Sequence, residues 1–253
     1  MDLVAPVAMT RMAILIGISI VIMTIASLAL LPLAVVTLFR ARRLYAVLAM
    51  KTARLLLRVW GIRLVVHQRD PLPTRQVVYV SNHSSTLDVL VLVALGLPNT
   101  RFFLSGFLRW YGPFGIIASL MGTFFTVPQD RPDERVRIFQ RADRILRRTG
   151  ESVFLSPEGG RILGGVIGRF NKGAFHLATS LRAPIVPLYF YIPPESDPGL
   201  GYNIRPGTVE VTVKPPIETR NWRIDDLVRN KERVRQMFVT WHEEAKREVR
   251  RAG

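Results

Sequence analysis

The most restrictive feature of this chain is an uninterrupted apolar segment near its N-terminus. Residues 13–39 contain no charged side chain in 27 consecutive positions. One helix of that length reaches about 40 Å, which exceeds the roughly 30 Å hydrocarbon thickness of a bilayer. The segment is too long for the core of a cleavable signal peptide, and no clear small-residue cleavage site follows it. We therefore expect a membrane-embedded helix, spanning the bilayer or re-entering one leaflet, with a kink or break near Pro32.

A basic segment follows the apolar one. Lys51, Arg54 and Arg58 are spaced by three and four residues, so they share one face of a helix whose other positions are largely apolar. Such a helix either lies among lipid headgroups or packs on the protein with a solvated basic face. Basic residues follow the apolar segment closely and only Arg11 closely precedes it, which predicts that the rest of the chain is cytoplasmic. We interpret residues 1–60 as an anchor in the cytoplasmic membrane.

The formal net charge of +16 favours a polyanionic neighbour. An anionic membrane leaflet and nucleic acid are the two candidates, and a basic, membrane-anchored nucleic-acid-binding protein is the alternative function from another class. The basic residues are spread without a recognisable nucleic-acid motif, so we expect the membrane and no nucleic acid. The absence of cysteine excludes a thiol nucleophile and disulfides, and the four scattered histidines give no metal-ligand spacing.

Beyond residue 60, short apolar runs alternate with helical stretches, which predicts an α/β domain over residues 61–253 that ends in an amphipathic helix. Intervening helices require crossover connections, so we expect a mixed, partly parallel sheet flanked by helices. The expected strands cover residues 62–67, 77–81, 101–104, 123–127, 152–155, 185–191 and 209–214. The expected helices cover residues 89–97, 133–148, 172–180 and 225–250.

A polar turn between the strand at 77–81 and the helix at 89–97 forms the first candidate site. It contains His83 and, five residues later, Asp88. An imidazole can accept a proton near neutral pH, and a carboxylate can fix its tautomer and stabilise the imidazolium. Without a protein nucleophile, such a base would activate a hydroxyl on the substrate. Asp88 also has a structural interpretation, because Ser-x-x-Asp before an apolar run resembles a capping box, and both roles can hold together.

A second polar cluster, residues 156–161, follows another expected strand. Gly159 and Gly160 allow a close backbone approach to a ligand, and Arg161 offers a planar fork suited to phosphate. Glu158 would hold Arg161 or accept a substrate hydroxyl. Taken alone, the cluster also fits a flexible turn with solvated charges.

These blocks resemble the glycerolipid acyltransferase family of 1-acyl-sn-glycerol-3-phosphate acyltransferases. Residues 82–88 match its Asn-His-x-x-x-x-Asp motif, and residues 157–161 resemble its Pro-Glu-Gly-Thr-Arg motif, with glycine in the Thr place. Residues 170–175 are similar to its Phe-Lys-x-Gly region, and residues 183–188 to its apolar block around Val-Pro. The four blocks occur in the family's order.

One block departs from the family pattern. Residues 122–127 open like the second motif, in which an arginine follows shortly and is assigned to the substrate phosphate. Here Pro128 and Gln129 stand where Asp-Arg is expected, and Arg131 or Arg135 comes later. The sequence leaves open which of the two arginines takes the phosphate role, and Arg131 is our candidate.

The resemblance implies an O-acyltransferase in which His83 removes the proton from a lysolipid hydroxyl while Asp88 orients its ring. The hydroxyl oxygen then attacks the thioester of acyl-CoA or acyl-carrier protein. The resemblance assigns substrate binding to Asn82, Arg131, Glu158, Gly159, Gly160, Arg161 and Lys172.

No metal or organic cofactor is expected, because the thioester supplies the activation. The expected acceptor is 1-acyl-sn-glycerol-3-phosphate, which gives phosphatidic acid. Another lysolipid, such as a lyso-ornithine lipid or a lysophospholipid, is the alternative within the same chemistry. A serine hydrolase is excluded, because the sequence has no Gly-x-Ser-x-Gly elbow.

Overall fold

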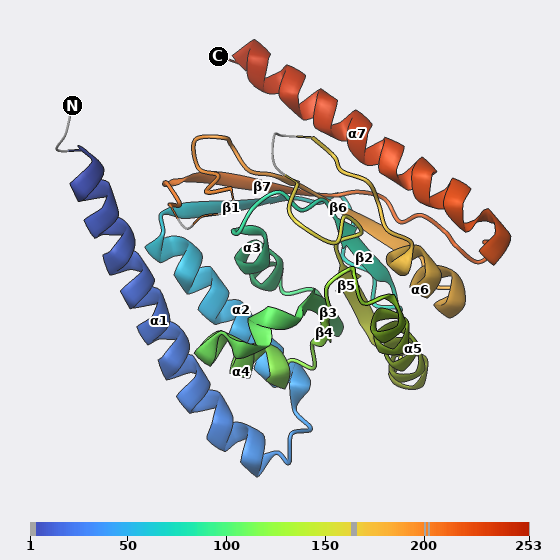
Figure 1. The fold of residues 1–253 in the computed structure, drawn as a ribbon, viewed down its shortest axis with the longest axis horizontal. Helices are drawn as coiled ribbons and strands as arrows, with labels where there is room; N and C mark the ends of the chain where they lie inside the picture. The colour runs from blue at the N-terminus through green and yellow to red at the C-terminus, as the bar shows by residue number, and fades with distance from the viewer. Residues whose placement is uncertain (1–3, 163–165, 200, 202, 253) are drawn as a thin grey trace.

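The computed structural model describes residues 4–162, 166–199, 201 and 203–252, which form a seven-stranded sheet with helices on both faces (Figure 1). The strands are β1 (Ile62–His67), β2 (Val78–Ser81), β3 (Thr100–Ser105), β4 (Phe124–Thr126), β5 (Ser152–Leu155), β6 (Ile185–Tyr191) and β7 (Gly207–Val213). The helices are α1 (Val4–Val36), α2 (Arg42–Val59), α3 (Asp88–Leu95), α4 (Gly112–Leu120), α5 (Pro132–Thr149), α6 (Gly173–Leu181) and α7 (Leu227–Ala252), with the 3-10 turns η1 (Gly106–Trp110) and η2 (Ile224–Asp226).

The sheet is mixed and mostly parallel, which confirms the predicted α/β architecture. Its strand order is β1-β7-β6-β2-β5-β3-β4, with β6 antiparallel to β7 and the other neighbouring pairs parallel. β2 lies at the centre, in register with β5 through Val78 and Val153 and with β6 through Val78 and Ile185. Both β2 and β5 are wholly buried, because helices cover both faces of the sheet. The carboxyl ends of these parallel strands therefore meet at one edge.

Each face of the sheet has its own apolar core. Along the central strand, Val77 and Tyr79 pack with α1–α4, whereas Val78 and Val80 pack with α5–α7. Successive side chains of a strand point to opposite faces, so one short apolar run supplies both cores. Figure 1 shows α1, α2 and α4 on one side of the sheet and α5, α6 and α7 on the other.

α1 is the apolar helix predicted at the N-terminus. Its segment Met9–Val36 is long and apolar enough to cross a membrane by length and composition, and 11% of the segment's most apolar part is buried. The helix continues through Pro32 and ends four residues later at Val36. An apolar helix that leaves most of its surface uncovered by protein indicates membrane association.

α2 packs on the protein. It buries five side chains, including Tyr45 and Leu57, against α1, α3 and the sheet. Where α2 ends, the Trp60 indole donates a hydrogen bond to the Ser19 hydroxyl of α1 at 2.8 Å. On the basic face, Arg54 donates from Nε to the Ala94 carbonyl at 2.9 Å. Of the two interpretations of this helix, packing on the domain is therefore observed.

The sequence pattern predicts no element between β3 and β4, whereas the structure has η1 and α4 there. α4 buries Gly115, Ile117 and Ala118 but exposes Ile116, so apolar residues occupy its outer side as well as its inner side. A helix that is apolar all round lacks the 3.6-residue alternation by which a packed helix is recognised.

Candidate active site

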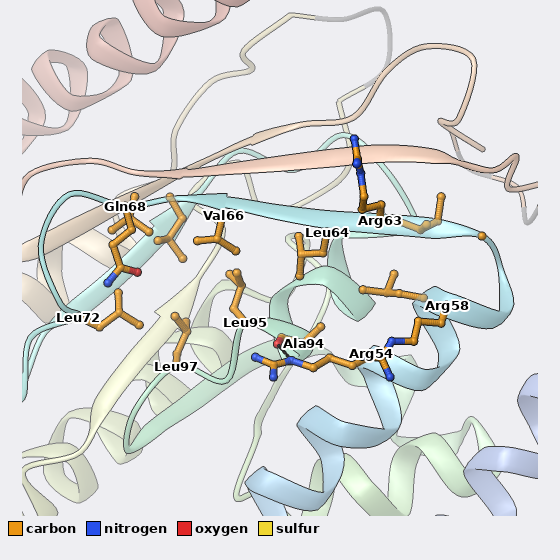
Figure 2. A pocket seen from close by; sticks show the side chains of 15 residues that line it. Arg54, Arg58, Arg63, Leu64, Val66, Gln68, Leu72, Ala94, Leu95 and Leu97 are labelled. Carbon is orange, nitrogen blue, oxygen red and sulfur yellow. Dashed lines mark hydrogen bonds between the residues drawn. The ribbon is translucent and has the colours of Figure 1, made fainter.

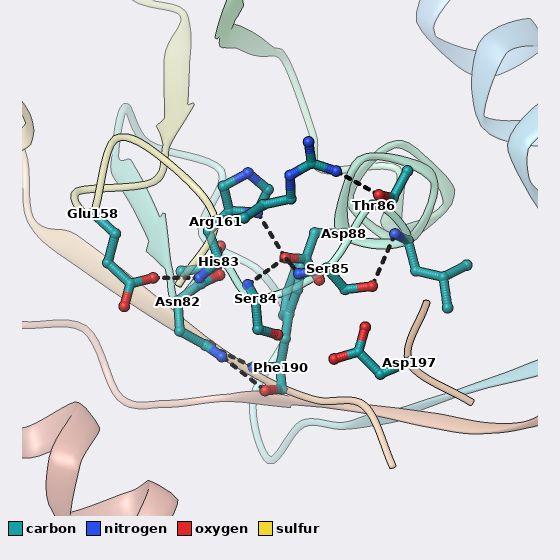
Figure 3. A network of polar contacts seen from close by, with 12 residues as sticks. Asn82, His83, Ser84, Ser85, Thr86, Asp88, Glu158, Arg161, Phe190 and Asp197 are labelled. Atoms are coloured by element: carbon teal, nitrogen blue, oxygen red, sulfur yellow. Dashed lines mark hydrogen bonds and ion pairs between the residues drawn. The ribbon is translucent and has the colours of Figure 1, made fainter. Parts of the chain in front are cut away.

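The predicted pair of His83 and Asp88 is formed at the carboxyl end of β2. The Nδ1 atom of His83 lies 2.7 Å from the Oδ2 atom of Asp88, and the imidazole remains partly exposed while the carboxylate is almost completely buried. Figure 3 shows the other ring nitrogen of His83 pointing away from Asp88. With a proton on Nδ1 donated to the carboxylate, Nε2 carries a lone pair and can accept a proton from a ligand.

Asp88 also organises the turn that carries His83. Its Oδ2 atom accepts the backbone N–H groups of Ser84 at 2.8 Å and of Ser85 at 3.0 Å. The Ser85 N–H bond to Asp88 is one of the two reciprocal bonds of a capping box, whereas the Ser85 hydroxyl accepts the N–H of Leu87 at 3.2 Å instead of that of Asp88. Asp88 therefore both caps the turn and orients the imidazole, because its Oδ2 atom accepts the N–H groups of the turn and also faces Nδ1 of His83. The other oxygen, Oδ1, is buried without a hydrogen-bond partner among the described residues.

Glu158 fastens the second polar cluster to the first. Its Oε2 atom accepts the backbone N–H of His83, and its Oε1 atom accepts the N–H of Gly168 at 2.7 Å. Burial raises the pKa of Glu158 to about 7, although both backbone hydrogen bonds act to lower that pKa. The carboxyl group therefore braces the loop. It neither holds Arg161, as one sequence-based interpretation proposed, nor lines the cavity described below.

The glycine turn after β5 comes close to His83. The N–H of Ile162 donates to the His83 carbonyl at 2.9 Å, and Nη1 of Arg161 donates to the Thr86 hydroxyl. Gly159 has φ +71, and a Cβ there would lie 2.6 Å from Nδ2 of Asn171. Only glycine fits that position without strain. Figure 3 shows Arg161 and Glu158 on the two sides of the His83 turn.

A cavity of about 460 Å³ opens over this turn, within the usual range of about 300–1,000 Å³ for ligand sites. His83, Asp88, Gly159, Gly160 and Arg161 line it, so the structure brings five of the predicted residues together. Its apolar wall is formed by Leu92, Phe103, Leu104, Phe107, Leu108, Phe139, Phe154 and Phe190. The cavity therefore combines a polar end, which carries the imidazole, with an apolar wall suited to a hydrocarbon chain.

The remaining predicted residues lie outside the cavity lining. Asn82 is buried and uses both ends of its amide on Phe190 of β6, accepting the N–H and donating to the carbonyl at 2.9 Å each. It therefore fixes the end of β2 to the neighbouring strand. Lys172 immediately precedes α6 and is exposed.

The arginine of the divergent block is placed differently from the sequence-based assignment. Arg131 is exposed at the start of α5 and pairs with Glu134 at 3.6 Å. Arg135, one helical turn later, lines the cavity and donates from Nη1 to the Val127 carbonyl at 3.1 Å. Of these two arginines, Arg135 is therefore the one that faces the site, because it lines the cavity and Arg131 does not.

The cavity also contains polar residues to which the sequence analysis assigned no role. Ser156, Gln129 and Ser105 line it from the ends of three different segments, and the Ser156 hydroxyl is buried without a described partner. No motif spacing connects these positions, because they meet only through the order of β3, β4 and β5 in the sheet.

A second, larger cavity of about 570 Å³ lies along β1 and shares no lining residue with the first. Leu64, Val66 and Leu95 form part of its apolar floor, and Arg54 and Arg58 of α2 lie at one end (Figure 2). Its lining contains no histidine, aspartate or glutamate, so it offers no acid or base for catalysis.

The known proteins that resemble this chain are acyltransferases. The family model named Acyltransferase matches residues 63–191. The 1-acyl-sn-glycerol-3-phosphate acyltransferase alpha of Ovis aries is 30% identical over 215 residues, which cover 81% of this chain and 72% of the relative. The 1-acyl-sn-glycerol-3-phosphate acyltransferase of Limnanthes douglasii is 25% identical over 169 residues, covering 67% and 59%.

The fold also resembles a solved structure. The crystal structure of the 1-acyl-sn-glycerophosphate (LPA) acyltransferase PlsC from Thermotoga maritima superposes with a TM-score of 0.73 at 19% identity, covering 93% of this chain and 98% of that one. This likeness extends beyond residues 63–191 to the helices on both sides.

Proposed function

This chain belongs to the acyltransferase family, and we propose that it transfers a fatty acyl group from a thioester to the free hydroxyl of 1-acyl-sn-glycerol-3-phosphate. The observation that carries this proposal is the 2.7 Å contact between His83 and Asp88 inside a half-apolar cavity. A lone imidazole with an orienting carboxylate and no cysteine in the chain suits attack by an external hydroxyl.

In the proposed reaction, Nε2 of His83 takes the proton from the lysolipid hydroxyl as its oxygen attacks the thioester carbonyl. The C–O bond forms, the C–S bond breaks, and the thiolate leaves. The imidazolium, stabilised by Asp88, returns its proton to the thiolate or to solvent. The donor is acyl-CoA or acyl-carrier protein. Holding both substrates in the cavity supplies a large part of the acceleration, since positioning alone lowers a barrier by roughly 7–11 kcal/mol.

The acceptor's phosphate is assigned to the basic side of the cavity. Arg161 and Arg135 line it, and the adjacent Gly160 leaves space for a ligand to approach the backbone. Arg135 replaces Arg131 in this assignment because it faces the cavity. Asn82, Glu158 and Lys172 are assigned no direct contact, because none of them lines the cavity; Asn82 and Glu158 instead hold the strand end and the turn in place.

α1 is proposed to hold the enzyme in the cytoplasmic membrane with the cavity on the cytoplasmic side. The basic residues that follow the apolar helix support that orientation by the positive-inside rule. They also favour a bilayer with anionic headgroups.

Thiol release by the purified protein in detergent micelles tests the proposed function. Because the chain has no cysteine, a thiol reagent reports only the CoA or carrier thiol that the reaction frees. We expect release from acyl-CoA or acyl-carrier protein that depends on lysophosphatidate, and its loss in His83→Ala, since such bases contribute about 10²–10⁴-fold. Residual activity above about a tenth would contradict the general-base role. Faster release with a lyso-ornithine lipid would identify the alternative acceptor.

A matched pair of arginines tests the acceptor site. Arg135→Lys should raise the KM for lysophosphatidate by about tenfold, because lysine lacks the planar fork and a lost interaction of about 1.4 kcal/mol changes affinity tenfold. Arg131→Lys, at the residue that precedes α5 and outside the cavity, should leave that KM unchanged. The reverse result would restore Arg131 as the phosphate ligand.

A further inference from the structure

We propose that η1 and the first part of α4 form a second lipid-binding surface, which lies in the membrane interface at the mouth of the catalytic cavity. We call this surface the aromatic turn and define it by Phe107, Trp110, Tyr111 and Ile116. Its partner is a bilayer with anionic headgroups. The contact does not depend on the reaction, so it can be tested without turnover.

The aromatic turn leaves large apolar side chains uncovered. Trp110 is 83% exposed, Phe107 54%, Tyr111 52% and Ile116 36%. Single exposed apolar residues are common in soluble proteins, but a contiguous group that includes a tryptophan marks an interaction surface. Phe107 and Tyr111 also contact each other edge to face, with ring centroids 5.7 Å apart, so their rings form one surface.

The aromatic turn adjoins the apolar N-terminal helix. The Ser27 hydroxyl of α1 donates to the Pro113 carbonyl of α4 at 3.0 Å, and α4 lies beside α1 in Figure 1. The same part of α1 exposes apolar side chains, with Leu28 at 63% and Leu31 at 39%. A bilayer that accommodates α1 therefore lies next to α4.

The composition of the segment fits the headgroup region. Trp and Tyr are the residues that concentrate at membrane–water interfaces, where one end of the side chain is apolar and the other is hydrated. Arg109 lies among them, with its guanidinium carbon 6.0 Å from the Trp110 ring centroid. No acidic residue occurs between residues 101 and 129. An uncharged to basic, aromatic surface complements an anionic leaflet.

The aromatic turn also borders the catalytic cavity. Phe107 and its neighbour Leu108 line that cavity together with His83. A lipid surface in contact with Trp110 would therefore lie at the entrance through which a lysolipid reaches the imidazole. A lysolipid could then keep its chain in an apolar environment while it moves from the leaflet to the cavity, which avoids the cost of exposing the chain to water.

Site-directed spin labelling tests the contact in the full chain. The protein contains no cysteine, so a nitroxide on Trp110→Cys reports only that position. The matched control is Ile224→Cys in η2, which is 55% exposed and begins the segment leading to α7 on the other face of the sheet. In vesicles of phosphatidylcholine and phosphatidylglycerol, we expect the label at 110 to be more accessible to oxygen than to a water-soluble nickel complex, and the label at 224 to show the reverse preference.

Tryptophan quenching provides a measurement that avoids the cysteine variant. Vesicles with brominated acyl chains should quench the wild type by a larger fraction than Trp110→Phe, because the other three tryptophans are more enclosed. Equal quenching of both proteins, together with a label at 110 that is accessible to the nickel complex, overturns the proposal. Spin–spin coupling between labels at 110 would instead identify a second copy of the chain as the partner, which also overturns it. Neither measurement involves acyl transfer, so these outcomes are distinct from failure of the proposed function.

Discussion

Replacement of Asp88 separates its two roles, because one carboxylate oxygen organises the turn and also faces the catalytic imidazole. Oδ2 accepts the backbone N–H groups of Ser84 and Ser85, and Nδ1 of His83 lies 2.7 Å away. In Asp88→Asn the amide oxygen can accept the same two N–H groups, and the NH₂ group takes the place of Oδ1, which has no described partner. We therefore expect this variant to fold with a free energy of unfolding within about 1–2 kcal/mol of the wild type.

Its activity should nevertheless be low. The amide is uncharged, so it no longer stabilises the imidazolium that forms when His83 accepts the proton. We expect kcat to fall by about 10²–10⁴-fold.

Asp88→Ala should lose stability as well as activity. It leaves two largely buried backbone N–H groups without an acceptor, at about 1–3 kcal/mol each, so the expected loss is about 2–6 kcal/mol. That is a large share of the roughly 5–15 kcal/mol by which a domain is stable.

Two assays on the same preparations distinguish the variants. Thiol release from acyl-CoA gives kcat, and denaturant unfolding followed by circular dichroism gives the free energy of unfolding. If Asp88→Asn retains more than about a tenth of kcat, the orienting role is refuted. If Asp88→Ala is as stable as Asp88→Asn, the role of Oδ2 as acceptor for the turn is refuted.

Two further predictions concern the loop after β5. Gly159→Ala should lower the thermal unfolding midpoint, because φ is +71 and the new Cβ would lie 2.6 Å from Asn171 Nδ2. Gly160→Ala is the matched control: no atom lies within 4 Å of its Cβ, so the midpoint should stay unchanged. Equal midpoints in the two variants would contradict this account. Burial raises the pKa of Glu158 from 4.5 to about 7, so the contribution of this group to stability is present at pH 4.5 and below and is lost as the pH rises through 7. Between pH 5 and 8 the free energy of unfolding of the wild type should fall by up to about 3 kcal/mol relative to that of Glu158→Gln, at about 1.4 kcal/mol per pKa unit. Denaturant unfolding at each pH measures both free energies. A difference between the two proteins that stays constant with pH would show that Glu158 is ionised throughout.

Much of the fold could be predicted because its signals are local. The strands at 62–67, 152–155 and 185–191 coincide with β1, β5 and β6, since each is a short apolar run bounded by polar turns. The elements between β3 and β4 were not predicted. α4 is apolar on its exposed side, so the alternation that normally distinguishes a helix from other apolar segments is missing.

The candidate site divides in the same way. His83 and Asp88 are five residues apart, and hydrogen bonds from the N–H groups of the turn to the Asp88 carboxylate hold them together, so the motif itself predicts their contact. Arg131 and Arg135 are equally good candidates in the sequence. Only the packing of α5 shows which of them faces the cavity.

The sequence by itself determined the apolar N-terminal helix, the alternation of strands and helices, and the imidazole–carboxylate pair, because each depends on neighbours within a few residues. Tertiary structure alone decided that Glu158 supports the backbone of His83 across 75 residues and that Asn82 joins β2 to Phe190 across 108. Those contacts follow from the placement of β2 between β5 and β6. Residue periodicity indicates that a strand is buried but carries no information about which strands lie beside it.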